Sequence, residues 1–362
     1  MLTVKKETEY KKHINGLKGF ACVMVMIGHY IGLYKYAESF PVKNGILELF
    51  DEFLNSKISF IIDETFWVIL FFVVSGYLVS QSSISSITDL IKKSVFRFLR
   101  LGLPVFAACF IIFIISETVG FYTSQTVPIL ENSFIQKPYN GEITFLQVML
   151  SPIDVLFLGK VSLNGPYWVL REMFLTSLII YLFSLLRNKL SNKTIYFLLV
   201  TAVFVLSMCF SNVVFAGIFG MIIALFEKDK DSFLNHNIPL LMIIVFCAAL
   251  YFIPRSRIAC IFFAALIVII PRIKLLNCIF SSKIALFINK ISFGGYSFHW
   301  PILLSVGMLV LIKTQNAFGL INACVISVFV SVILTVLMSI LYYYLLEQYI
   351  YKFIKMIQNK WR

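Results

Sequence analysis

Acidic side chains are scarce in this sequence, with 18 Asp and Glu against 31 Lys and Arg, and charged residues make up only 14% of it. Soluble proteins are nearer a quarter charged. Hydrophobic residues make up 60% of the chain, and no stretch between the apolar segments could build a separate water-soluble core. The composition therefore excludes an ordinary soluble enzyme and predicts an integral membrane protein made of a single domain, residues 1–362.

Paired cysteines are also missing. The seven cysteines fall singly inside or beside apolar runs, at positions 22, 109, 209, 247, 260, 278 and 324. This spacing fits neither a disulfide framework nor a metal site, so no metal is expected. The net charge of +13 is spread between apolar runs rather than gathered in a patch, so nucleic acid is not an expected partner. The first apolar run, 20–34, has no cleavage site after it and is expected to be retained.

Long apolar windows are what the sequence has instead. Windows able to cross the roughly 30 Å hydrocarbon layer fall at 17–36, 62–80, 96–116, 166–186, 194–210, 212–226, 238–253, 257–271, 294–313 and 319–345. They predict an all-α, polytopic membrane protein of about ten transmembrane helices in one bundle. The windows 212–226 and 257–271 are short, and re-entrant segments are the alternative for them.

Lys and Arg are concentrated in alternate connections, which predicts a multi-pass topology with both termini in the cytoplasm. Two long loops, 37–61 and 117–165, are then expected outside. Within the second loop, the apolar stretch 148–158 is too short to cross the membrane and is expected to lie at the membrane interface.

Two basic side chains share one face of the first window. Lys18 and His29 are eleven residues apart. At about 100° per residue, this spacing brings them to the same helix face, about 16 Å apart along the axis. An ionisable group at membrane depth is costly, so His29 is a candidate functional residue. His299 is the other histidine within a window, whereas His13 and His236 are expected to be solvated.

Other polar pairs repeat the helical spacing. Arg97 and Arg100 share a face, and they suit either contact with anionic lipid or a clamp for phosphates. Trp168 and Glu172 also share a face, and an ion pair of Glu172 with the neighbouring Arg171 is the structural alternative. Tyr296 and His299 are three residues apart, with simple packing as the alternative for His299.

Six short motifs follow one another along the chain. After the spacing of Lys18 and His29 come FFVVSGYLVS with Ser75, RFLRLGLP with Arg97 and Arg100, YWVLREMF with Trp168 and Glu172, ISFGGYSFHWPI with Tyr296 and His299, and LLEQYIYKFIK with Glu347. Together they resemble, in order, the motifs of the acyltransferase-3 family of membrane-bound O-acyltransferases. The sequence departs from the family at Lys18, where arginine is usual, and at Asn15, where an acidic residue is often found. Lysine keeps the charge but lacks the planar fork that suits phosphate.

The resemblance implies an enzyme that moves an acyl group, most simply acetyl from acetyl-CoA, from the cytoplasm to a hydroxyl of an envelope polysaccharide or lipid-linked glycan. It further implies the bacterial cytoplasmic (inner) membrane, and a stand-alone form without an appended esterase-like domain. The implied catalytic residues are His29, Glu172 and His299. The implied donor-binding residues are Lys18, Arg97, Arg100, Ser75, Trp168 and Tyr296.

The role of His29 stays open between two kinds of chemistry. The imidazole could act as a general base on the acceptor hydroxyl, or it could carry the acyl group covalently. Either role requires neutral imidazole, and Glu172 is the expected group that fixes its tautomer. Close helix packing is the alternative for Ser75, and a surface ion pair near Lys352 is the alternative for Glu347.

Two other function classes fit a basic, polytopic chain. A transporter or flippase for an envelope glycan intermediate would also bury His and Glu, although no inverted repeat is evident. A membrane glycosyltransferase or glycan polymerase would be expected to carry arginine-rich or paired acidic outer loops, whereas the basic residues here concentrate on the predicted inner side.

Overall fold

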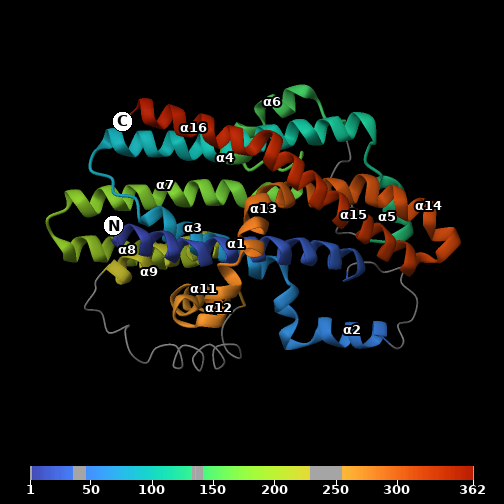
Figure 1. Ribbon diagram of the computed structural model, residues 1–362, viewed down its shortest axis with the longest axis horizontal. Helices are drawn as coiled ribbons and strands as arrows, with labels where there is room; N and C mark the ends of the chain where they lie inside the picture. The colour runs from blue at the N-terminus through green and yellow to red at the C-terminus, as the bar shows by residue number, and fades with distance from the viewer. Residues whose placement is uncertain (1, 36–45, 133–134, 136–141, 229–254, 362) are drawn as a thin grey trace. The chain divides into compact units, whose positions relative to one another are not determined.

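The computed structural model describes residues 2–35, 46–132, 135, 142–228 and 255–361, and no β-strand occurs among them. The helices of Figure 1 are α1 (Leu2–Lys35), α2 (Ile46–Asn55), α3 (Glu64–Ser80), α4 (Ile87–Thr118), α5 (Thr123–Leu130), α6 (Phe145–Ile153), α7 (Trp168–Lys189), α8 (Lys193–Phe210), α9 (Asn212–Lys228), α11 (Arg255–Ile269), α12 (Lys274–Phe280), α13 (Lys283–Ile302), α14 (Met308–Phe318), α15 (Leu320–Tyr342) and α16 (Gln348–Lys360). Turns of π-helix join α13 to α14 (Leu303–Gly307) and α15 to α16 (Tyr343–Glu347).

In the part of the chain that the structure describes, fewer helices are long enough to cross a membrane than the sequence predicts for the whole chain. Among the described residues, five helices are long and apolar enough to cross a membrane, or six if the bent pair of α11 and α12 counts as one span. The five are Lys12–Leu33, Ile87–Thr118, Gly165–Lys189, Lys283–Phe318 and Leu320–Lys360. The chain is an all-α membrane protein, but the expected number of about ten spans is not confirmed.

Length explains the difference. The expected windows 62–80, 194–210 and 212–226 do form helices, but their apolar parts are Glu64–Ser80, Thr194–Ser207 and Asn212–Leu225. These are shorter than the roughly 20 residues that a helix needs to cross the hydrocarbon core. The window 238–253 lies outside the described residues.

The chain divides into two compact units, each assembled from three segments. Unit 1 comprises Met1–Ala21, Thr65–Phe98 and Glu172–Asn289, and unit 2 comprises Cys22–Glu64, Leu99–Arg171 and Lys290–Arg362. The unit boundaries fall inside several helices, α1, α4, α7 and α13 among them. The expectation of a single domain over 1–362 stays a prediction.

Helices α3 and α9 approach each other closely inside unit 1. A Cβ atom on Gly76 would lie 1.8 Å from the carbonyl oxygen of Gly217, and one on Gly220 would lie 2.0 Å from that of Val73. Only glycine fits at such positions, which is the usual way for helices in lipid to pack tightly. Beside this contact, an apolar core gathers Val79 of α3, Ile180 and Tyr181 of α7, Tyr196 of α8 and Met221 of α9.

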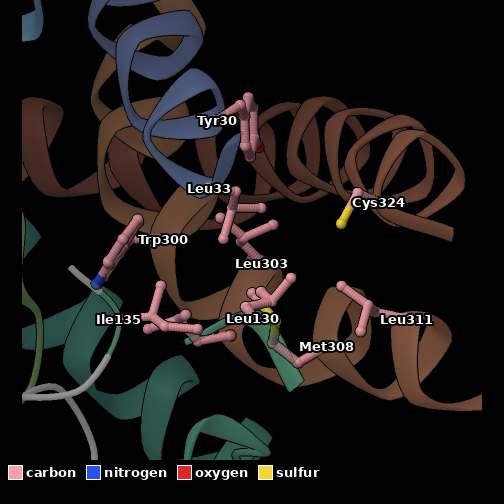
Figure 2. Packing of buried hydrophobic residues seen from close by; sticks show 10 residues of the cluster. Tyr30, Leu33, Leu130, Ile135, Trp300, Leu303, Met308, Leu311 and Cys324 are labelled. Atoms are coloured by element: carbon pink, nitrogen blue, oxygen red, sulfur yellow. The ribbon is translucent and has the colours of Figure 1, made fainter. Parts of the chain in front are cut away.

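The apolar core of unit 2 joins the first helix to the last third of the chain. Figure 2 shows Tyr30 and Leu33 of α1 packed with Leu130 of α5, Trp300 of α13, Leu303 of the π turn, Met308 and Leu311 of α14 and Cys324 of α15. Trp300 directly follows His299 in the sequence, so this core positions the two histidines described below.

The expected short apolar segment at 148–158 is also present, as α6 and the π turn that follows it (Asp154–Leu158). Thr144 and Gln147 form a capping box that starts α6. Its apolar side chains Leu146, Met149 and Leu150 are exposed. Such a surface suits lipid, although its place at the interface stays a prediction.

Candidate active site

Two histidines meet in unit 2, one from α1 and one from α13. His29 Nδ1 lies 2.7 Å from His299 Nε2. The ring planes are within 5° of parallel and the ring centroids are 4.9 Å apart. Parallel rings stacked face to face could not approach to 2.7 Å without overlapping, so the rings meet edge to edge. This is the in-plane geometry of a strong hydrogen bond between two imidazoles.

A backbone carbonyl sets the direction of this bond. His299 Nδ1 lies 3.0 Å from the carbonyl oxygen of Gly295, one helical turn earlier. A carbonyl oxygen only accepts, so Nδ1 of His299 carries the proton, and in neutral imidazole its Nε2 is then the acceptor. His29 Nδ1 must therefore donate to His299. With both rings neutral, Nε2 of His29 carries a lone pair and is the basic, nucleophilic nitrogen of the pair.

Access and aromatic contacts differ between the two rings. His299 is completely buried, whereas His29 is partly exposed. The centres of the Trp300 and His29 rings are 5.4 Å apart. The Tyr30 ring is nearly perpendicular to the His299 ring, with 6.3 Å between the ring centres. Tyr296 is 6.2 Å from His299, ring centre to ring centre. The reachable ring is thus His29, and His299 is the ring held behind it.

A proline in α13 ties the segment before α7 to this site. Pro301 has no N–H to donate to the carbonyl oxygen of Ser297, four residues earlier. Nδ2 of Asn164, a fully buried residue, donates to that oxygen instead, at 2.8 Å. The proline thus creates the acceptor that anchors Asn164.

Two tyrosines strengthen the same connection. The Tyr167 hydroxyl donates to the Ser297 hydroxyl oxygen at 2.9 Å, and the Tyr296 hydroxyl donates to the carbonyl oxygen of Pro166. Gly165 lies beside Trp300, where a Cβ atom would be in ordinary van der Waals contact with the indole nitrogen, at 3.5 Å. Asn164, Tyr167 and Ser297 were not identified from the sequence, although Pro301 inside an apolar helix was a signal for an unpaired carbonyl.

Small and polar residues set the position of α13 in unit 2. A Cβ atom on Gly294 would lie 2.9 Å from the Cα atom of Ser339 in α15. Toward α1, the Cys22 thiol donates to the carbonyl oxygen of Ser292 at 3.1 Å. Tyr30 and Thr335 hydroxyls are 3.2 Å apart. These contacts hold α1, α13 and α15 together, and with them the two imidazoles.

Ser75 and Arg97 meet in unit 1. Arg97 Nη2 donates to Ser75 Oγ at 3.0 Å, which joins α4 to α3. Both were expected to bind the acyl donor, and their hydrogen bond brings the second and third motifs together. The alternative for Ser75, close helix packing, stays open as well, because the adjacent Gly76 lies against the backbone of Gly217.

The remaining expected site residues lie in different surroundings. Lys18 and Glu172 belong to unit 1 and are partly buried, whereas Trp168 and Arg100 belong to unit 2 and are exposed. The group hydrogen-bonded to His29 Nδ1 is His299, so the structure supplies an orienting partner other than Glu172. The roles of Lys18, Trp168 and Glu172 stay predictions. Arg171, the expected ion-pair partner of Glu172, donates from Nε to the carbonyl oxygen of Phe157 at 3.2 Å.

Two minor expectations were wrong. His13 is fully buried rather than solvated, because it lies on α1 where that helix packs inside unit 1. Glu347 is 3% exposed, so it does not form a surface ion pair. It lies in the π turn between α15 and α16, where the widened turn directs it inward. His236 lies outside the described residues.

Comparison with known protein families finds a match over residues 11–344 to the family described as an acyltransferase domain. No curated protein and no solved structure matches this chain. The match covers nearly the whole sequence, so the chain belongs to the acyltransferase-3 family and is an acyltransferase.

Proposed function

We propose that this acyltransferase moves an acetyl group from cytoplasmic acetyl-CoA to a hydroxyl of an envelope carbohydrate, with His29 as the catalytic residue. The observation that carries the proposal is the hydrogen-bonded series from Gly295 through His299 to His29. It places a lone pair on Nε2 of the more accessible ring, which is what acyl transfer between a thioester and a hydroxyl requires. The family match favours this reading over a transporter or flippase.

In the general-base route, Nε2 of His29 takes the proton of the acceptor hydroxyl as its oxygen attacks the thioester carbonyl carbon. The carbon–sulfur bond breaks, and the imidazolium returns the proton to the departing thiolate. His299 accepts the hydrogen bond from Nδ1 throughout and stabilises the imidazolium that forms, as the orienting group does in a catalytic triad.

In the covalent route, Nε2 itself attacks the thioester carbonyl carbon and displaces the thiolate. The acyl-imidazole then passes its acyl group to the acceptor oxygen, and the acceptor's proton goes to the thiolate or to solvent. Both routes use the same tautomer of His29. Incubation with labelled acetyl-CoA without acceptor distinguishes them, because only the covalent route leaves label on the protein.

Donor binding is proposed to involve Lys18, Arg97, Arg100, Ser75, Trp168 and Tyr296. Arginine forks suit phosphates, and the Arg97 guanidinium is already oriented by its hydrogen bond to Ser75. Tyr296 lies against His299 and is held by Pro166, so its ring is fixed beside the reacting pair.

His29→Ala tests the proposal directly. We expect acetyl transfer to fall about 10²- to 10⁴-fold, the usual contribution of a general base, while the amount of protein in the membrane stays normal. Mass spectrometry of the envelope glycan should show one acetyl group fewer on its acceptor sugar. His13→Ala is the matched control, since His13 is the other described histidine on α1 and belongs to unit 1. Full transfer by His29→Ala would exclude the mechanism.

A further inference from the structure

Helix α16 forms a hollow with α4, the helix that carries the third motif. Arg100 of α4 and Tyr351, Ile354, Lys355 and Gln358 of α16 line a cavity of about 460 Å³ in unit 2. The four residues of α16 follow the spacing i, i+3, i+4, i+7, so they lie on one face of that helix. Figure 1 shows α16 running beside α4. The volume falls within the range of small-molecule sites.

The lining suits an anion. Arg100 and Lys355 bring two positive charges, both exposed, and no carboxylate is among the lining residues that the structure describes. Glu347, the acidic residue of the π turn that precedes α16, is buried in the interior and accepts a hydrogen bond from Tyr351. That bond holds the tyrosine in place at the edge of the hollow.

The rest of the lining suits an apolar or aromatic group next to the charge. Ile354 is 1% exposed and forms an apolar floor, and Tyr351 offers an aromatic ring. Gln358 adds an amide that both donates and accepts hydrogen bonds. Two cations next to an apolar and an aromatic side chain suit a phosphate ester whose organic part is planar or hydrophobic.

The site depends on a part of the chain that the family match does not reach. The match ends at residue 344, whereas the π turn and α16 extend from Tyr343 to Lys360. Arg100 lies within the matched region, but three of the residues that would complete its anion site, Tyr351, Lys355 and Gln358, lie beyond it.

We propose that the hollow between α4 and α16 binds a phosphate ester, with Arg100 and Lys355 as its phosphate ligands. Two sources carry this chemistry: the phosphorylated adenosine end of an acyl-CoA donor, and the headgroup of an anionic phospholipid. The first source rests on the proposed function, whereas the second does not.

Binding to the purified full-length protein in neutral detergent tests the proposal. One arm titrates coenzyme A, and the other adds mixed micelles of phosphatidylglycerol, with phosphatidylcholine micelles as the uncharged comparison. We expect at least one arm to bind, and Lys355→Gln and Arg100→Gln each to weaken that binding about tenfold, as the loss of a charged hydrogen bond does. Raising the salt concentration should weaken it as well, because the lining cations are exposed.

Lys352→Gln is the matched control. It removes the same charge from the same helix, but Lys352 lies over the Tyr349 ring, 5.0 Å from its centre, and does not line the hollow. The affinity of the Lys352→Gln variant for coenzyme A and for phosphatidylglycerol should stay within about twofold of that of the unchanged protein. Both lysines are exposed, so neither change should disturb folding.

The outcomes separate cleanly. If Lys355→Gln selectively loses coenzyme A binding, the ligand of the hollow is the acyl donor. If it selectively loses phosphatidylglycerol binding, the ligand is an anionic phospholipid. Equal binding by Lys355→Gln and Lys352→Gln, or no binding of either probe, overturns the proposal. Acetyl transfer that still depends on His29 in that case would leave the proposed function intact.

Discussion

One carbonyl oxygen, that of Gly295, sets the hydrogen positions on two imidazoles at the scale of single residues. It receives the Nδ1 proton of His299, which makes Nε2 of His299 the acceptor for His29. A carboxylate is the usual partner in this place, but a carboxylate at membrane depth would bring a charge that must itself be neutralised. A second imidazole held by a backbone carbonyl orients the first ring without adding that charge.

Substitution of His299 tests this orienting role. His299→Leu removes the acceptor for His29 Nδ1–H, so we expect transfer to fall about 10- to 100-fold, as for other groups that orient a functional histidine. His299→Gln retains an acceptor oxygen and should recover part of the rate. The measurement is the turnover number at saturating acetyl-CoA, with the Michaelis constant for acetyl-CoA changing little. Equal rates for the two variants would show that His299 acts only by packing.

At the scale of one element, the C-terminal end of helix α13 departs from regular helical hydrogen bonding, and this departure connects the helix to the rest of the site. Pro301 interrupts the helical hydrogen bonds, Asn164 takes up the carbonyl of Ser297, and a π turn follows at Leu303–Gly307. Turns of π-helix often occur at functional sites, where they redirect side chains. Here the irregular stretch begins two residues after His299, so it anchors the segment before α7 next to the histidine pair.

Asn164→Ala is expected to destabilise the protein by about 1–3 kcal/mol, because it leaves the buried carbonyl of Ser297 without a donor. Pro301→Ala supplies an N–H for the same oxygen, so Asn164→Ala should cost less in that background. Thermal unfolding in detergent of the two single variants and the double variant measures this coupling.

Asn188→Ala is the control for that cycle. Asn188 Nδ2 also donates to a backbone carbonyl, that of Ile84, at 2.7 Å, but its side chain is exposed. Water can replace its bond, so the change should cost clearly less. Strict additivity of Asn164→Ala and Pro301→Ala would mean that the two residues do not share the Ser297 carbonyl.

At the scale of the whole molecule, the distribution of basic residues predicts which segments face which side of the membrane. Lys160 belongs to the loop expected outside, and Lys189 belongs to a connection expected inside. Both side chains are exposed, and Lys160 forms a surface ion pair with Asp154 at 3.1 Å. Either position can therefore be changed with little effect on stability.

Single cysteines at these positions measure the topology. In a background without the native cysteines, Lys160→Cys should react with a membrane-impermeant thiol reagent added to intact cells. Lys189→Cys should react only after the membrane is opened. The reverse pattern would contradict the predicted cytoplasmic termini.

The sequence by itself determined the class of the molecule and the positions of most of the long apolar helices that the structure describes. Apolar windows mark helices because burial in lipid requires backbone hydrogen bonds within each segment, and this requirement is local. Spacings of three and four residues likewise predicted Tyr296 beside His299. The motif order indicated the family that the comparison then confirmed. The number of spans is not confirmed by the described residues, because hydropathy windows do not say where a helix ends.

Only the tertiary structure decided which helix faces meet. His29 and His299 are 270 positions apart, and nothing in either motif names the other as its partner. The same holds for Asn164 with Ser297, and for Arg100 with the face of α16. Periodicity tells which residues share a face of one helix, whereas the choice of the facing helix depends on close packing at glycines and on polar groups that must find partners away from water. That packing brought His29 to His299, where the sequence alone had suggested Glu172.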